Sequence, residues 1–287
     1  MTDHGDPLPF RPARRRLLLA GAASLATAGC GEGTPAMPDT SSDPLWREDP
    51  SLPRDRLDAA RLASLPDAAR RWFSRSVPLD RPLAVMARLR MDGEMKLKGQ
   101  WRSFAAEQVI HRERGFVWRA ATRMFGLPVK GHDRLFDGVG EMQWRLAGFF
   151  SVANASTPDI TRSAAGRWIG ECFWFPPLLA GPATRWTAGD APGTATARRA
   201  LAGEEEAVTI TVSDAGDMLT SRLERWGLPE GAERNARHPF GGTLSEHREF
   251  GGYRIPTVVN GGWWFGTDRY ASEGEFFRAR VTDASFR

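Results

Sequence analysis

The stretch VMARLRMDG, residues 85–93, alternates apolar and polar side chains almost one for one. Val85, Ala87, Leu89 and Met91 would face one side of an extended strand, and the residues between them would face the other. A strand with one apolar face is typical of an antiparallel sheet that covers a core on one side. This stretch therefore predicts a β-rich fold, and much of the remaining chain repeats its pattern.

The period of two returns at 141–146, 208–212 and 277–281. Turn signals separate the apolar runs, and connections this short make neighbouring strands antiparallel. The signals are Asp92-Gly93, Asp137-Gly138, Asp214-Ala215-Gly216 and Gly251-Gly252. At this spacing we expect roughly ten to twelve strands.

Two segments have helical periodicity instead. Residues 55–77 predict an N-terminal helix that Pro66 splits, because proline breaks a helix interior. Ser163 to Phe175 predict a second helix, and Thr157 could cap an extension at its start. The predicted fold class is α+β: a large curved antiparallel sheet, half-barrel-like, with the N-terminal helix and one interposed helix against it.

The first thirty residues have the layout of a bacterial export signal. Arg14-Arg15-Arg16 precedes an uncharged apolar run, 17–28, that is too short to span a bilayer. Cys30 after small residues resembles the lipobox of bacterial lipoproteins, which implies a lipid on its thiol, although Thr27 stands where that pattern usually has leucine. The arginines followed by leucines resemble a twin-arginine signal. An ordinary cleaved signal that happens to carry a cysteine is the alternative.

This layout predicts three parts and a location. Residues 1–29 would be a signal peptide, 30–54 a lipidated flexible tether rich in Pro, Ser, Asp and Gly, and 55–287 a single β-rich domain. The expected partner is the membrane, through the lipid on Cys30, on the periplasmic side. Gly31 is not the Asp associated with inner-membrane retention, so the outer membrane is favoured in a host that has one.

Composition and motifs argue against several classes of function. The net charge is only +4, and no cationic cluster follows the signal, which argues against nucleic-acid binding. The four histidines beyond the signal lack metal-ligand spacing, and no cofactor motif is present, so neither a metal nor a cofactor is expected. Cys172 has no neighbouring base and is interpreted as a small buried side chain. In Gly131-His132-Asp133, the adjacent His and Asp would point to opposite faces of a strand.

Aromatic residues are numerous, with 11 Trp and 16 Phe in the chain. Most would fill the core, but a half-closed sheet lined by them can leave a groove for an apolar ligand. The residues that we expect in such a groove are Trp101, Phe104, Trp118, Trp144, Trp174 and Trp263.

A candidate polar site consists of Asp133, Arg167 and Glu171. Arg167 and Glu171 are four residues apart on the predicted helix and so share a face. An ordinary surface ion pair is the simpler explanation. If the fold brings both to Asp133 in one cleft, a hydrolase acting on an envelope component becomes possible, whereas side chains on opposite faces would exclude it.

Several dispersed motifs resemble an uncharacterised bacterial family of unknown function over roughly residues 64–283. They are Trp101-x-x-Phe104-x-Ala-x-Gln108, Phe116-x-Trp118, Gly131-x-Asp133, Gly138-x-Gly140-x-Met142, Gly166-Arg167-Trp168-x-x-Glu171-x-x-Trp174-Phe175-Pro176 and Gly252-x-x-Ile255-Pro256. The resemblance implies a membrane-tethered or exported protein and no particular catalytic residues.

The order of strands and helix also resembles the periplasmic lipoprotein-carrier fold, in which a curved sheet encloses lipid. Fold does not carry function with it. The first hypothesis is a lipid-anchored protein that binds an apolar or lipid-like ligand in the aromatic groove. The alternatives are the envelope hydrolase, and a structural or partner-binding lipoprotein whose groove is filled by its own side chains.

Overall fold

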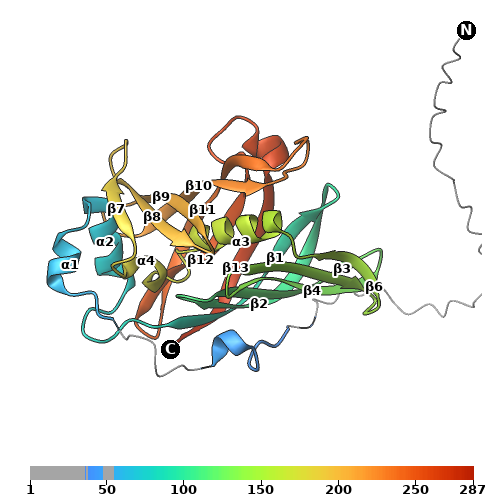
Figure 1. The fold of residues 1–287 in the computed structure, drawn as a ribbon, viewed down its shortest axis with the longest axis horizontal. Coiled ribbons are helices and arrows are strands. Elements are labelled where there is room, and N and C mark those ends of the chain that lie inside the picture. Colours follow the sequence, from blue (N-terminus) through green and yellow to red (C-terminus); the bar gives the residue numbers. More distant parts are fainter. Residues whose placement is uncertain (1–35, 37, 48–54) are drawn as a thin grey trace, which may run out of the picture. The chain divides into compact units, whose positions relative to one another are not determined.

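A single antiparallel sheet dominates the computed structural model, which describes residues 36, 38–47 and 55–287 (Figure 1). In the described part of the chain the sheet has 13 strands in the order β6-β5-β4-β3-β2-β1-β13-β12-β11-β10-β9-β8-β7. The predicted α+β class with one large antiparallel sheet is therefore confirmed, and the sheet has one strand more than the upper expectation.

Two meanders build the sheet, and β1 and β13 join them at its centre. The first meander is β1 (Met86–Leu97), β2 (Gln100–His111), β3 (Gly115–Met124), β4 (Leu127–Phe136), β5 (Val139–Leu146) and β6 (Phe150–Ala155). The second is β7 (Arg185–Ala188), β8 (Thr194–Leu201), β9 (Glu204–Val212), β10 (Met218–Gly227), β11 (Ala236–Phe250), β12 (Tyr253–Trp263) and β13 (Glu275–Phe286).

Because β6 and β7 are the two edge strands, the chain must pass across the sheet to connect them. It does so through α3 (Pro158–Gly170) and the short α4 (Pro177–Ala180). Figure 1 shows α3 lying across one face of the sheet. A brief π-helical turn, η2 (Tyr270–Gly274), precedes β13.

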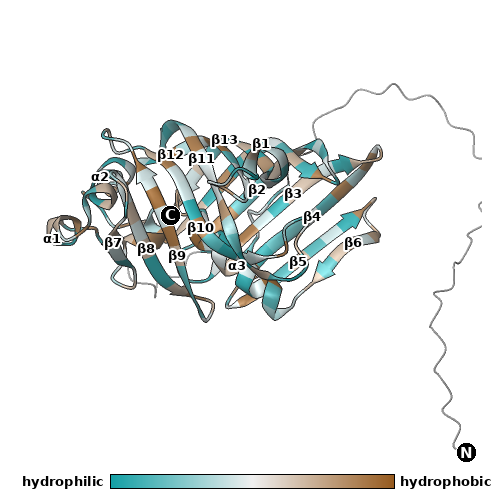
Figure 2. Ribbon diagram, turned by 90° about the horizontal axis from the view of Figure 1, so that it is seen from above, coloured by the Kyte–Doolittle hydropathy of each residue, from teal (hydrophilic) through white to brown (hydrophobic). Residues whose placement is uncertain are grey.

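The apolar and polar alternation places the core on the face that α3 covers. In β1, Ala87, Leu89 and Met91 are fully buried in the main core, while Arg88 and Arg90 lie on the other face. Figure 2 shows the hydrophobic and hydrophilic bands that this alternation draws across the strands. The predicted strands at 85–91, 141–146, 208–212 and 277–281 are all present, and each observed strand is two to six residues longer at one end or both.

One expected turn, Asp92-Gly93, is instead the middle of β1. Asp92 pairs with Ala105 and Gly93 with Phe104, so the strand continues to Leu97. The glycine is needed for packing, because a Cβ at Gly93 would lie 2.0 Å from the carbonyl oxygen of Arg278 on β13. Close approach of a neighbouring strand is the other common reason for a glycine in a β pattern.

The N-terminal helical segment is divided as predicted. Asp58 caps α1 (Ala59–Ala63) by accepting the Arg61 amide, and α2 (Asp67–Ser76) begins directly after Pro66. The apolar face of α2 places Trp72 and Phe73 in the main core, where both are almost fully buried. Helix α2 contacts β7, β8, β9 and β12, so it closes the same face as α3.

The interposed helix starts earlier and ends earlier than the predicted 163–175. Thr157 caps α3, with its hydroxyl oxygen accepting the Ile160 amide, and Pro158 takes the first helical position that suits proline. The helix ends at Gly170. Phe173, Trp174 and Phe175 therefore lie in the following turns and fill the core there, with Trp174 only 1% exposed.

Part of the segment expected as a flexible tether packs on the sheet instead. Residues 44–46 form a short 3-10 helix, η1 (Pro44–Trp46), whose Leu45 and Trp46 are buried against Val109 and Val117. These partners face away from α3. We name residues 38–47 the N-terminal strap. It extends the folded domain beyond the expected boundary at residue 55.

Charged contacts hold the strap to the sheet. The Thr40 amide donates to Glu107, whose carboxylate is fully buried and lies near Arg88 and Arg90. Asp43 pairs with Arg119 at 3.0 Å. The expected signal peptide and Cys30, the expected site of lipidation, lie outside the described residues. No helix among the described residues is long and apolar enough to span a membrane.

Candidate functional site

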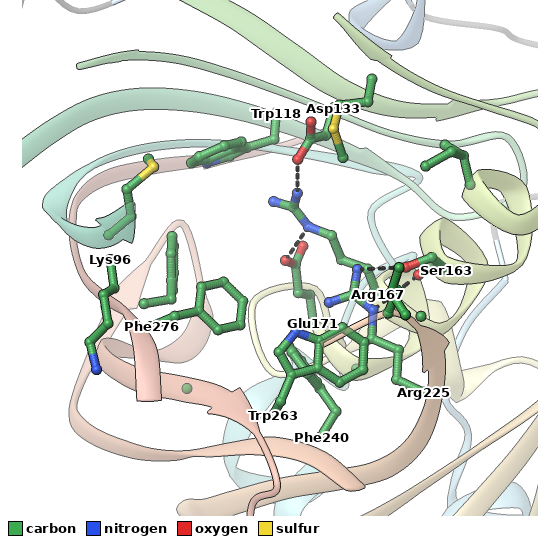
Figure 3. Close-up of a pocket in the computed structure, with 18 of the residues that line it drawn as sticks. Lys96, Trp118, Asp133, Ser163, Arg167, Glu171, Arg225, Phe240, Trp263 and Phe276 are labelled. Carbon is green, nitrogen blue, oxygen red and sulfur yellow. Dashed lines mark hydrogen bonds and ion pairs between the residues drawn. The ribbon is translucent and has the colours of Figure 1, made fainter. Parts of the chain in front are cut away.

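A cavity of about 910 Å³ lies between α3 and the sheet. Strands from both meanders contribute to its wall, as do α3 and the turn after it. Figure 3 shows ten labelled lining residues arranged around this space. The volume lies near the upper end of the range of about 300–1,000 Å³ for small-molecule sites.

Large apolar side chains form most of the wall because the inward positions of each strand are apolar. The aromatic lining residues are Trp118, Trp144, Phe173, Trp174, Phe240, Trp263, Phe276 and Phe277. Met95, Met124 and Met142 also line the cavity, and methionine adapts to ligands of irregular shape. The wall therefore suits a bulky apolar ligand.

Four of the six aromatic residues expected in a groove line this cavity: Trp118, Trp144, Trp174 and Trp263. Phe104 lies one layer behind, where its ring contacts Trp118 and stacks on Phe277 at 5.3 Å between ring centroids. Trp101 does not belong to this site.

The position of Trp101 follows from strand parity. Phe104 pairs with Gly93 on the inner face, and a residue three positions away along a strand points to the opposite face. The Trp101 ring lies between the cations of Lys96, at 5.3 Å, and Arg278, at 4.2 Å. Trp101 therefore lies on the outer face of the sheet, where its ring makes cation–π contacts with Lys96 and Arg278.

The three residues of the candidate polar site meet inside the cavity. Arg167 Nη1 lies 3.1 Å from Asp133 Oδ2, and Arg167 Nε lies 2.7 Å from Glu171 Oε1. Figure 3 shows the Arg167 guanidinium between the two carboxylates. All three side chains are no more than a quarter exposed, so this is not the simple surface pair.

Neighbouring groups fix the two carboxylates. Trp144 Nε1 donates to Asp133 Oδ1 at 2.9 Å, and Gln108 Nε2 donates to Glu171 Oε2 at 2.6 Å. The Arg167 guanidinium also lies over the rings of Phe116 and Trp118, at 4.9 and 5.0 Å. An arginine held between carboxylates and aromatic faces is rigid, and it places a fixed polar spot in an apolar wall.

Arg225 on β10 is a second cation of the cavity. Its Nε donates to the Ser163 carbonyl at 3.1 Å, and its guanidinium lies over the rings of Phe240 and Trp263. Burial lowers the pKa of Arg225 to about 10, with the nearby Arg167 acting in the same direction. No carboxylate of the described residues forms an ion pair with it within 4.0 Å. Its charge is thus available to a ligand.

Trp118 and Trp174 line the cavity, and Gln108 holds the lining residue Glu171 from behind. Among the described residues, the indole N–H groups of Trp118 and Trp174 and the Oε1 of Gln108 have no hydrogen-bond partner. All three side chains are at least 95% buried. Buried polar groups are normally paired, so a ligand oxygen could accept from either indole.

Two small residues let α3 approach β10 closely beside these groups. A Cβ at Gly166 would lie 3.1 Å from Arg225 Cγ, and one at Gly170 would lie 3.2 Å from Leu223 Cδ2. The spacing of four residues puts both glycines on one helical face. This contact helps to place Arg225 and Arg167 side by side.

The sequence did not predict three residues of the site: Arg225, Gln108 and Ser163. The alternation of side chains along β10 could have identified Arg225. Ser221, Leu223 and Arg225 lie on one face of this strand, and all three line the cavity. Gln108 interrupts an otherwise apolar inward row in β2, and it is fully buried.

The remaining candidates from the sequence lie away from this chemistry. His132 faces outward and contacts Glu141 at 3.1 Å, whereas Asp133 faces the cavity. Cys172 is fully buried, and burial raises the pKa of its thiol far above the usual value. No histidine lines the cavity among the described residues, and these residues contain no group of three or more potential metal ligands.

The fold and the cavity together define an α+β domain with one open antiparallel sheet and a ligand-sized space beneath its crossing helix. The chain belongs to the family of unknown function DUF6544, whose model matches residues 55–272. This membership agrees with the family resemblance of the dispersed motifs. No curated protein matches the chain.

Three solved structures are similar to this chain over most of its length, at low sequence identity. A putative outer membrane lipoprotein-sorting protein domain from Vibrio parahaemolyticus has 8% identity and a TM-score of 0.37, over 77% of this chain and 91% of that one. A LolA superfamily protein from Nitrosomonas europaea has 6% identity and a TM-score of 0.41, over 77% and 92%. A DUF1329 family protein from Desulfovibrio piger has 9% identity and a TM-score of 0.40, over 81% and 94%.

Proposed function

We propose that this protein binds an apolar or lipid-like ligand in the cavity beneath α3. The observation that carries the proposal is the cavity itself: about 910 Å³ of space walled by aromatic and methionine side chains. A well-packed core leaves few voids larger than a water molecule. A cavity of this size is therefore first interpreted as a ligand-binding site.

The polar groups indicate the second property of the ligand. Arg225 presents a guanidinium that forms no ion pair within 4.0 Å among the described residues, where the Trp118 and Trp174 indoles also lack an acceptor. These are donors, which match carboxylate, ester or phosphate oxygens. The ligand that fits is therefore an amphiphile with a long apolar part and an oxygen-rich head.

A cavity-filling substitution tests the proposal. Ala153 on β6 lines the cavity, while its neighbour Asn154 is exposed on the other face. We expect Ala153→Trp to weaken binding of the fluorophore N-phenylnaphthylamine at least about tenfold, because the indole occupies ligand space. Palmitate should displace the fluorophore from the unsubstituted chain.

Asn154→Trp is the matched control, and it should bind the fluorophore like the unsubstituted chain. Urea unfolding of both variants establishes that each is folded. If folded Ala153→Trp binds fluorophore and palmitate as well as Asn154→Trp does, the cavity is not the binding site.

The second candidate function is the envelope hydrolase, which the meeting of Asp133, Arg167 and Glu171 in one cavity favours. Two carboxylates could act as acid and base there. Both are engaged by Arg167, however, and their arrangement resembles a fixed structural network. Hydrolysis of a lipid ester that Asp133→Asn and Glu171→Gln abolish, without loss of binding, would establish this alternative.

We further propose that the domain acts at the periplasmic side of a membrane, held by a lipid on Cys30. The arginine and leucine signal before Cys30 supports this location. Labelling of cells with an alkyne fatty acid should mark the chain, and Cys30→Ser should remove the label. A labelled Cys30→Ser chain would contradict this anchor. The double substitution Arg14→Lys and Arg15→Lys tests export by the twin-arginine route.

A further inference from the structure

Three hairpin turns of the first meander lie at the same end of the strands. In an antiparallel meander every second turn falls at one end, so the β1–β2, β3–β4 and β5–β6 turns are neighbours. We call these turns and the strand ends beside them, residues 95–103, 121–130 and 142–153, the hairpin end. The β2–β3 and β4–β5 turns lie at the other end.

The hairpin end exposes large apolar side chains. Phe125, Phe149 and Phe150 are 75%, 72% and 62% exposed, and Leu127 and Val152 are about half exposed. These are five of the nine large hydrophobic residues that are exposed in the described chain. Phe149 and Phe150 contact each other, with ring centroids 4.7 Å apart. Such a cluster on a loop end marks an interaction surface.

The hairpin end carries an excess of positive charge, with Glu94 opposite Ser103 at its border. Its three segments contain six cations and not one Asp or Glu: Lys96, Lys98, Arg102, Arg123, Lys130 and Arg145. These include all three lysines of the chain. Within the described residues none of the six forms an ion pair within 4.0 Å, although most other arginines of the domain do.

The other end of the same strands has a different character. In its β2–β3 and β4–β5 turns, Arg114 pairs with Asp137 at 2.8 Å, and Arg112 contacts Glu113 at 3.2 Å. Cations there are balanced by nearby carboxylates. The excess of unpaired cations is thus specific to one end and does not reflect a generally basic domain.

We propose that the hairpin end docks on the surface of an anionic phospholipid bilayer. Aromatic side chains favour the headgroup level of a membrane, and cations beside them are attracted to anionic lipid phosphates. The exposed phenylalanines would lie at the headgroup level, and the six cations would be attracted to the lipid phosphates. Together they match an anionic lipid surface better than a protein partner, whose interface core is poor in lysine.

The docking surface is continuous with the cavity. Lys98, Met124 and Val152 belong to the hairpin end and also line the cavity. Lys98 and Val152 are exposed, so this part of the lining is the cavity mouth. A bilayer held at the hairpin end would lie beside that mouth, and an amphiphile could pass between the two without crossing bulk water. The inference goes beyond ligand binding, because docking does not require the cavity to be occupied.

Environment-sensitive dyes at the two ends of the strands test the docking. The full chain carries Cys30→Ser, and a dye is attached either at Leu127→Cys, in the hairpin end, or at Val139→Cys, at the other end. Both positions are exposed apolar residues, and the remaining Cys172 is fully buried. The vesicles are equal parts phosphatidylcholine and phosphatidylglycerol, with phosphatidylcholine alone for comparison.

We expect the dye at Leu127→Cys to shift to the blue on the anionic vesicles and much less on the neutral ones. The dye at Val139→Cys should stay in water on both. Any contribution of the apolar run 17–28 is common to both labelled chains. An unchanged dye at Leu127→Cys, or an equal shift at the two positions, would overturn the proposal.

Substitutions separate the contribution of the cations to docking from that of the exposed phenylalanines. Neutralising Lys98, Arg123, Lys130 and Arg145 to glutamine should weaken the affinity for the anionic vesicles, measured by titrating the dye signal, about fivefold for each cation removed. Replacing the three phenylalanines with serine should abolish the insertion. The residues are exposed, so unfolding midpoints should not change. If neither set alters the response, the surface does not act on lipid, and capture of a protein at this end would instead identify a protein interface.

Discussion

Arg167 holds two carboxylates together in an apolar wall, whereas Arg225 forms no ion pair within 4.0 Å with a carboxylate of the described residues. Removing one partner of a buried ion pair leaves an uncompensated charge, which costs more than the pair contributes. Replacing a buried cation among aromatic rings with an apolar side chain of similar length removes a desolvation cost instead. The two arginines should therefore respond differently to the same substitution.

We expect Arg167→Met to lower the free energy of unfolding by about 2–3 kcal/mol, because Asp133 and Glu171 are left partly buried and unpaired. Arg225→Met should change it by less than about 1 kcal/mol, because the lost hydrogen bonds to Ser163 and cation–π contacts are offset by removing a buried charge. Urea unfolding at neutral pH measures both. An equal loss in the two variants would show that Asp133 and Glu171 do not depend on Arg167.

Asp217 predicts how the stability depends on pH. Hydrogen bonds from Arg254, at 2.8 and 3.1 Å, hold the pKa of Asp217 below its usual 3.8, although burial opposes them. A carboxyl group whose pKa is lower in the folded state contributes stability above its unfolded pKa. That contribution is lost as the pH falls through the folded pKa.

Asp217→Asn should therefore cost about 1 kcal/mol at neutral pH, and the difference from the unsubstituted chain should shrink as the pH falls below about 4. Unfolding midpoints in urea at a series of pH values provide the comparison. A difference that stays constant down to pH values well below 3.8 would mean that the pair with Arg254 does not act through the Asp217 charge.

At the scale of elements, the position of α3 decides the shape of the cavity. Gly140 on β5 is one contact that fixes it: its amide donates to Thr161 Oγ1 at 2.9 Å. A Cβ at Gly140 would lie 2.6 Å from Thr161 Cα, which is backbone of the helix. The helix or the strand would have to move to accommodate any larger side chain.

Gly140→Ala should therefore lower the free energy of unfolding by about 1–3 kcal/mol and weaken fluorophore binding, because α3 is displaced. Gly181→Ala is the control, since a Cβ there meets nothing within 4 Å and its φ of −74° suits alanine. Urea unfolding and fluorophore titration measure the two effects. Equal behaviour of the two variants would contradict this role of Gly140.

The sequence predicted the strands well because a half-buried sheet imposes a period of two on each of them. It was wrong at Gly93, where the reason for glycine lies in Arg278, far along the chain. It was also wrong at residues 171–175, because the chain after Gly170 buries aromatic residues in turns at a spacing that imitates a helix. Local patterns do not contain such tertiary contacts.

The candidate site was predictable where parity and helical spacing apply. Arg167 and Glu171 share a helical face, and Asp133 has the inward parity of β4, so they meet in the cavity. Trp101 was assigned to the groove by composition alone, and parity places it on the outer face. Strap residues Leu45 and Trp46 lie in a segment whose composition is typical of a flexible tether, and only the apolar outer face of β2 and β3 explains their burial.

At the scale of the whole molecule, the cavity follows from the topology. Two meanders meet at β1 and β13, and their outer edges, β6 and β7, must be connected by a chain that crosses one face. Helix α3 makes this crossing, and the cavity lies between it and the sheet. Space between a curved sheet and a crossing helix is therefore a property of the fold, and the aromatic lining determines what it can hold.

Native mass spectrometry of the chain, purified without detergent, tests ligand binding most directly. We expect a population with the added mass of an amphiphile, released at raised collision energy, and a much smaller population in Ala153→Trp than in Asn154→Trp. A chain that has only its bare mass, and that stays bare after incubation with palmitate or phospholipid, would contradict the proposed function.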